Sequence, residues 1–593
     1  MIQLLDVFGF LSVVLRGLTL ALQSMVIGGL VFDLFIARAD AGAAAVRACR
    51  RLLIAGALAL ALALAGYLAA DTAILMSTAD LSLAAVAGAN FFVAGVIATA
   101  LALAVAALAS WAARPDRRTG TLGGGQLRDP DLPNLPLHPD LPGHPDLPGL
   151  PQEPDLAGRR GGGARPALAA ALLLSLGLLG AAVATSHAAA RLEGRALLLA
   201  LTSLHLAAIA CWIGGLPYLL LALCRAPDTA TARTVASRFS RLAQGSVAVL
   251  LAAGIGLAAI YVGSPAAILG TAYGAMVSAK AVLLALLLGL GALNYYVVHR
   301  AEAGDTSGLA GLRRFAEAEV GIGFTVILAA ASLTSQPPAV DLAARDLVSL
   351  TEIEARMAPR PPRLVPPAAS ERLSPALQRA AASPGGRDLG AYLSYVPGQL
   401  AEPRTAGELA LSEFNHNVSG LVVLLAGLLA VAARAGWRWA RNWPLAFLAL
   451  AIFLFLLADA EYWPLGPVPF WRGFLVADAL QHRLAVLLIV AFALFERRVQ
   501  TGSAASPATA LVFPFVCFLG GALLLTHSHS LNNSKNELLA ELSHASIAIL
   551  GVAAGWSRWL ELRLPDGPRR AISWIWPICL ILVGALLLDY RES

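Results

Sequence analysis

Long apolar runs alternate with short arginine-bearing loops along most of this 593-residue chain. About fourteen of these runs have the length of about 20 residues that an α-helix needs to cross a bilayer. They lie near residues 10–36, 50–71, 82–111, 166–186, 195–224, 235–263, 273–299, 312–335, 417–435, 443–459, 479–495, 508–526, 537–562 and 571–589. The pattern predicts an all-α fold, a polytopic transmembrane helix bundle embedded in the lipid bilayer.

Two polar stretches divide these runs into groups. Residues 114–165 contain a proline-rich repeat, which cannot form a helix and is expected to be an extended linker. Residues 336–413 are rich in proline and arginine, with weak helical patches such as Leu347–Arg356. The predicted organisation is an N-terminal group of spans at 1–113, the linker at 114–165, a transmembrane core at 166–335, the polar segment at 336–413 and a C-terminal transmembrane domain at 414–593.

The loop arginines predict how the spans are oriented across the membrane. Every odd-numbered predicted span is followed by a basic stretch, as at Arg50 and Arg51 after the first and at Arg497 and Arg498 after the eleventh. The positive-inside rule then places these loops and the 114–165 linker in the cytoplasm. The N-terminus and the 336–413 segment are expected on the opposite side.

Composition excludes several classes of function. The chain is 58% hydrophobic and 13% charged, which is not the composition of a soluble enzyme. Its formal net charge of +6 is explained by the loop arginines, so no nucleic-acid partner is expected. The chain has no P-loop and no strand-associated GxGxxG motif, so transport driven directly by ATP is not predicted. Its five cysteines are scattered, so no thiolate metal site is predicted.

An internal repeat links the first predicted spans to the core. Residues 26–30 read VIGGL and residues 212–216 read WIGGL, and an arginine-bearing start of the next span follows each. The glycine pairs predict close helix packing in both copies. Thr19 in the first copy aligns with His205 in the second, so only the second copy carries a candidate ligand.

Histidines gather toward the predicted outer face. Residues 526–544, THSHSLNNSKNELLAELSH, form a polar island between two apolar runs, and on a helix Glu541 and His544 share one face. Imidazole and carboxylate groups suit copper, zinc or iron, and ionisable groups in a membrane indicate a functional site. The candidate metal ligands are His187, His205, His416, His482, His527, His529, His544 and Glu541.

Each candidate also has a plainer interpretation. His527 and His529 form either a two-imidazole ligand pair or a polar cap at a helix end, and His205 is either a ligand or a helix-to-helix hydrogen bond. Glu317 and Glu319, near the cytoplasmic start of their span, either serve an exit path or pair with neighbouring arginines.

The chain resembles the copper resistance protein D (CopD) family of bacterial inner-membrane proteins. The segments that carry the resemblance include LHLAAIACWIGGL at 204–216, SRFSRLA at 237–243, GTAYGAMVSAKAVLL at 270–284, WPLGPVPFW at 463–471 and LTHSHSLNNSKNELLAELSH at 525–544. The resemblance covers most of residues 166–593 and implies a CopD-like core at 166–335. It also implies copper handling at the inner membrane, a periplasmic location for 336–413, and a small periplasmic copper-binding donor protein of CopC type.

Two functional hypotheses follow. In the first, the chain is not an enzyme: it transports or delivers copper, contributing to copper homeostasis and resistance, and the outward-facing histidines bind the ion. In the alternative, the chain is a membrane cytochrome in which His205, His482 and His544 supply axial ligands to haem b. A third possibility is a structural or assembly role in which the histidines bind nothing tightly.

Overall fold

The computed structural model describes residues 5–37, 41–114, 164–300, 306–333, 337–368, 371–374, 377–378, 405–503, 506–525 and 534–592. This part of the chain is helical, and its one β-type contact is an isolated bridge between Tyr462 and Val468. The fold class is therefore confirmed as an all-α bundle.

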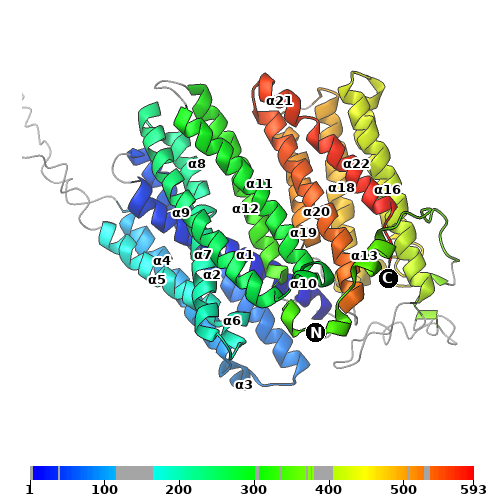
Figure 1. Cartoon of the computed structure of the whole chain (residues 1–593), viewed down its shortest axis with the longest axis horizontal. Coiled ribbons are helices and arrows are strands. Elements are labelled where there is room, and N and C mark those ends of the chain that lie inside the picture. Colours follow the sequence, from blue (N-terminus) through cyan, green and yellow to red (C-terminus); the bar gives the residue numbers. More distant parts are fainter. Residues whose placement is uncertain are drawn as a thin grey trace, which may run out of the picture.

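The first group of helices occupies the blue-to-green part of Figure 1. Its helices are α1 Leu5–Val31, α2 Ala43–Thr78, α3 Leu83–Ala87, α4 Asn90–Ala112, α5 Ala164–Ala184, α6 His187–Ala190, α7 Arg195–Trp212, α8 Leu216–Arg225, α9 Thr229–Val262, α10 Pro265–Gly270, α11 Ala272–Arg300 and α12 Thr306–Leu333. A short π-helical turn, Phe32–Ala37, extends α1.

The second group occupies the yellow-to-red part of Figure 1. Its helices are α16 Ala406–Arg434, α17 Ala446–Leu457, α18 Ala477–Gln500, α19 Val512–Leu525, α20 Ser534–Arg563, α21 Asp566–Ile572 and α22 Ile575–Leu588, and α13 Leu350–Met357 lies between the groups in sequence. Helix α20 joins the two groups, because it packs against α11 and α12 as well as α19 and α22.

Twelve helices in the described part of the chain are long and apolar enough to cross a membrane, so the chain is a multi-pass membrane protein. The expected number of about fourteen is not confirmed. The difference lies in α12 and α20, which have 28 and 30 residues but are not among the twelve. Both carry several charged side chains, such as Arg314 and Glu319 on α12 and Arg558 on α20.

The two ends of the bundle are distinguished by their short helices. The short helices α3 and α6 and both chain ends lie toward the lower end of Figure 1, and the arginine-bearing α21 lies at the upper end. We call the lower end the α6 end and the upper end the α21 end. The predicted outer face corresponds to the α6 end.

The repeated glycine motifs pack directly against each other. A Cβ added to Gly28 of α1 would lie 2.3 Å from the carbonyl carbon of Gly214, and one added to Gly214 would lie 1.9 Å from the Ser24 carbonyl oxygen. No side chain fits at these distances, so glycine is what lets α1 and α7 touch. The prediction of close packing at these motifs is confirmed.

The same motif interrupts a membrane helix. Helix α7 ends at Trp212 and α8 begins at Leu216, so Ile213, Gly214 and Gly215 form a turn inside a single predicted span. Ile213 and Gly215 keep right-handed helical torsions, so the turn is a local irregularity within one span. This turn is enclosed by protein, with Ile213 only 3% exposed.

A buried ionic network closes the second group of helices near the α21 end. Arg558 of α20 donates to Glu496 of α18 at 2.8 Å and to Glu561 at 2.9 Å, and all three side chains are at most 5% exposed. Glu561 also accepts from Arg434 of α16 and from the Trp576 indole N–H of α22. Four helices are therefore joined by charge-assisted hydrogen bonds. Arg434, the last residue of α16, is part of this network.

Candidate metal centre

Two of the predicted histidines meet in the second group of helices. The ring centroids of His416 on α16 and His544 on α20 lie 6.1 Å apart at an interplanar angle of 85°. Tyr590, just beyond α22, stacks on His416 at 3.9 Å between centroids and meets His544 edge-on at 5.8 Å. A metal ion about 2 Å from one nitrogen of each imidazole would hold two ring centres roughly 5 to 6 Å apart. The separation therefore suits two ligands of one ion.

Close helix packing produces this arrangement. A Cβ added to Gly420, one turn after His416, would lie 2.3 Å from the Leu588 backbone nitrogen, and one added to Gly584 would lie 2.3 Å from the Leu424 nitrogen. These glycines let α16 and α22 approach closely enough for Tyr590 to reach His416.

The start of α16 is also fixed. Thr405 and Glu408 form a capping box, in which the Thr405 hydroxyl accepts from the Glu408 backbone and the Glu408 carboxylate accepts from the Thr405 N–H. The box satisfies backbone donors at the helix start, about three turns before His416.

A hydrogen bond sets the tautomer of His416. Its Nδ1 lies 2.8 Å from the Ser412 carbonyl oxygen, which can only accept, so Nδ1 carries the hydrogen. In the neutral ring the lone pair is then on Nε2. Metal-ligating histidines have this arrangement, with one ring nitrogen donating to a backbone carbonyl and the other facing the ion.

Carboxylates surround the pair. Glu541 lies one turn before His544 on α20, and both side chains are 7% exposed. Glu592 accepts from the Tyr590 hydroxyl at 2.9 Å and from the Ser412 hydroxyl at 2.6 Å. The cluster therefore combines two imidazoles with nearby negative charge, which suits a cation.

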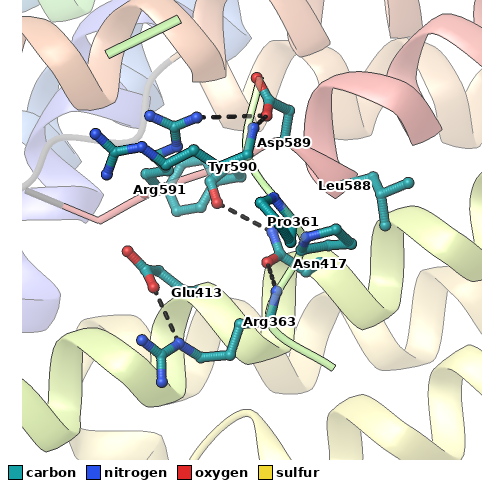
Figure 2. Close-up of a pocket in the computed structure, with 10 residues that line it drawn as sticks. Pro361, Arg363, Glu413, Asn417, Leu588, Asp589, Tyr590 and Arg591 are labelled. Carbon is teal, nitrogen blue, oxygen red and sulfur yellow. Dashed lines mark hydrogen bonds and ion pairs between the residues drawn. The ribbon is translucent and has the colours of Figure 1, made fainter. Parts of the chain in front are cut away.

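A cavity of about 390 Å³ lies beside this cluster (Figure 2). Its wall is formed by Arg360, Pro361, Pro362, Arg363, Glu413, Asn417, Leu588, Asp589, Tyr590 and Arg591. The cavity contains both charge signs, and Arg363 pairs with Glu413 at 3.1 Å. Because Tyr590 belongs to this wall and also covers His416, the cavity is adjacent to the imidazole pair.

Asn417 holds the cavity wall together. Its Nδ2 donates to the carbonyl oxygens of Leu587 at 3.1 Å and Tyr590 at 3.0 Å, and its Oδ1 accepts from the Arg363 backbone N–H at 2.7 Å. Figure 2 shows Asn417 between the end of α22 and the 360–363 segment. One buried amide thus binds three backbone groups, two at the end of α22 and one in the 360–363 segment.

His482 forms a separate polar pair. Its Nδ1 lies 2.7 Å from the Asp459 carboxylate, and its side chain is 47% exposed at the start of α18. A carboxylate behind an imidazole is again a common arrangement around a metal ligand. Asp459 sits on the α17 side of α16, whereas His416 faces α22, so the structure does not place His482 with the His416–His544 pair.

His205 lies in the first group of helices, away from that pair. It packs over Gly254 of α9, where an added Cβ would lie 3.4 Å from His205 Cε1. Its Nδ1 is buried and makes no well-formed hydrogen bond in the described part of the chain. The Lys280 ammonium of α11 is within electrostatic range of this ring. The ring is also hydrogen-bonded to the backbone of Leu250 on α9, which agrees with the helix-to-helix interpretation of His205.

The remaining candidates are not brought together. His187 is exposed at the start of α6. His527 and His529 lie outside the described residues. Among the described residues, no group of three or more histidine, cysteine, aspartate and glutamate side chains has a metal-binding geometry.

Two features of the structure were missed by sequence reasoning. Tyr590 was not a candidate, and its only sequence signal is an aromatic residue between Asp589 and Arg591 at the end of a span. Glu319 was expected either to serve an exit path or to pair with a neighbouring arginine, but it is 3% exposed and accepts from Asn294 of α11. Glu317 does pair with Arg314, at 2.8 Å.

Comparison with known proteins identifies one segment. Residues 233–333 match the copper resistance protein D (CopD) family. This confirms the expected CopD resemblance for α9 to α12. The chain is also 32% identical over 171 residues to the copper transport protein CutJ of Bacillus subtilis (strain 168), a match that covers 28% of this chain and 30% of that protein. No solved structure matches the chain.

The haem alternative gains no support. The two comparisons that match name copper proteins and neither names a haem protein.

Proposed function

We propose that this protein transports or delivers copper at the bacterial inner membrane, using an outward-facing site centred on His416 and His544. The convergence of these imidazoles around Tyr590, beside a cavity, is the observation that carries the proposal. The CopD segment and the CutJ match support copper as the ion. The ion is the cargo, and the chain is not an enzyme.

In the proposed orientation the α6 end faces the periplasm, and the cavity opens there. A periplasmic copper-binding protein of CopC type delivers the ion by ligand exchange. His416 and His544 provide two imidazole ligands, with Glu541 as a further ligand or charge partner. Copper(I) accepts imidazole ligands and low coordination numbers, so two histidines suffice for transfer.

The other histidines have secondary roles in this proposal. His527 and His529 precede α20 and capture copper at the mouth, together with the exposed His187 and the His482–Asp459 pair. His205 receives the ion deeper in the bundle. Replacement of both His527 and His529 by alanine is therefore expected to reduce copper capture without affecting membrane insertion.

Copper uptake into proteoliposomes tests the proposal. Copper(I) is added outside vesicles that contain the wild type, the His416→Ala/His544→Ala variant or a His299→Ala control, a histidine near the end of α11 that the proposal does not use, and vesicular copper is measured over time. We expect uptake by the wild type and the control, and at least a tenfold lower rate for the double variant. Equal rates for all three proteins, or no uptake by the wild type above empty vesicles, would contradict it.

A further inference from the structure

A carboxyl group is buried in the CopD segment without a cationic partner. Glu319 of α12 is 3% exposed and forms no ion pair among the described residues. Its hydrogen bonds come from two neutral donors, the Asn294 amide of α11 and the Trp212 indole at the end of α7. Burial disfavours the charged form of a carboxyl group, and a carboxylate in a membrane ordinarily needs a partner cation.

The charged groups on neighbouring helices are directed elsewhere. On α20, Arg558 pairs with Glu496 and Glu561, and Arg563 lies 3.9 Å from Glu317. The other charged or titratable side chains described on helices packed against α12 are Tyr273, Lys280, Tyr295 and Tyr296 on α11, Arg16 on α1, Tyr218, Cys224 and Arg225 on α8, Arg233, Arg238, Arg241 and Tyr261 on α9, Cys517 on α19, and Lys535, Glu541 and His544 on α20. None of them forms an ion pair with Glu319 in the described structure.

The partner amide reveals the protonation state. Asn294 donates through Nδ2 to Glu319 Oε1, while its own Oδ1 is buried without any hydrogen-bond partner. An ionised carboxylate can only accept, so it leaves Oδ1 unsatisfied. A protonated carboxyl group supplies an O–H that can donate to Asn294 Oδ1. The acid and the amide are then joined by two hydrogen bonds. Buried polar atoms are rarely left unpaired, so the protonated form fits this site better.

The carboxyl group also faces the interruption between α7 and α8. Gly323 lies one turn after Glu319, and a Cβ added there would be 2.6 Å from Ile213 Cγ2. Ile213 is the first residue of the turn that separates the two helices.

We propose that Glu319 is a membrane-buried protonation site whose proton exchange accompanies copper movement. The coupling to copper movement rests on the proposed function, whereas the protonation site does not. In the resting state the Glu319 O–H bond is intact and donates to Asn294. When copper passes, that bond breaks, the proton leaves to water, and the carboxylate offsets the charge of the ion. The return of a proton from water restores the neutral pair.

Two variants separate this role from a structural one. Glu319→Gln keeps a neutral side chain of the same shape, and its amide N–H can donate to Asn294 Oδ1, so the fold is preserved. The amide of the Glu319→Gln variant cannot release or take up a proton near neutral pH. Glu317→Gln is the matched control, since Glu317 lies on the same helix but pairs with Arg314 and accepts from the Trp559 indole at 3.0 Å.

The first test is infrared spectroscopy of the purified full chain in detergent at neutral pH. We expect a carbonyl band of a protonated carboxylic acid in the wild type and in Glu317→Gln, and loss of intensity in that band in Glu319→Gln. An identical band in all three proteins overturns the protonation site, whether or not the protein transports copper.

The second test measures proton movement in proteoliposomes with a trapped pH indicator when copper(I) is added. We expect copper-dependent proton movement in the wild type and in Glu317→Gln, and at least a tenfold smaller signal in Glu319→Gln, which still binds copper. Undiminished proton movement in Glu319→Gln overturns the inference. If the wild type moves no copper, the proposed function fails and the infrared result alone decides the protonation site.

Discussion

The buried ionic network allows one stability prediction to be worked out in detail. Replacing Arg558 by methionine removes the cation that holds Glu496 and Glu561. Glu561 keeps Arg434 and the Trp576 indole, whereas Glu496, 1% exposed, keeps only the Gln500 amide at 2.6 Å. Loss of one partner from a buried ion pair costs about 3–5 kcal/mol. Because one carboxylate of the two stays paired, we expect the free energy of unfolding to fall by about 3 kcal/mol.

The companion variant isolates the cause. The double variant Arg558→Met/Glu496→Gln also removes the carboxylate that Arg558→Met alone leaves unpaired. It is therefore expected to recover most of the lost stability. The measurement is the free energy of unfolding in mixed micelles titrated with denaturing detergent, followed by tryptophan fluorescence. A single variant as stable as the wild type, or a double variant less stable than the single one, would refute the reasoning.

Two further predictions concern packing and pH. Gly214→Ala places a Cβ against the Ser24 carbonyl, so α1 and α7 must separate. Overpacking of this kind lowers the stability of the fold by about 1–3 kcal/mol or more, and the loss is measurable as a lower melting temperature in detergent. Lys535, at 2.9 Å, and the Ser349 cap lower the pKa of Glu352 to about 2 from an ordinary 4.5. The Lys535–Glu352 ion pair between α13 and α20 should therefore be fully formed above about pH 4.5 and be lost as the pH falls toward 2. Spin labels on the two helices should then move apart. An unchanged label distance across that range would show that the ion pair does not hold the helices.

Much of the fold is readable from the sequence because membrane helices have a simple signature. The apolar runs predict the helices, and the glycine pairs predict close helix packing, which the structure shows to be a contact between α1 and α7. The expected number of spans was less secure, since α12 and α20 mix apolar and charged residues. The interruption at Ile213 was hidden within an apolar run, where composition does not distinguish a helix from a turn.

The sequence predicts which residues belong to the site, but not that they lie close together. His416 and His544 were both candidates, yet they lie in spans far apart in sequence, and only the packing of α16, α20 and α22 brings them together. Hydropathy carries no information about which helices are neighbours. For the same reason, the sequence did not separate His205 from this pair or identify Tyr590.

Elemental analysis of the purified protein tests the copper site most directly. The wild type and the His416→Ala/His544→Ala variant are incubated with a copper(I) complex and freed of unbound metal, and copper, iron and zinc are quantified per chain. We expect about one or two copper ions with negligible iron in the wild type, and at least about one copper ion fewer in the double variant. Equal copper content in the two proteins, or near-stoichiometric iron in the wild type, would contradict a copper site at His416 and His544.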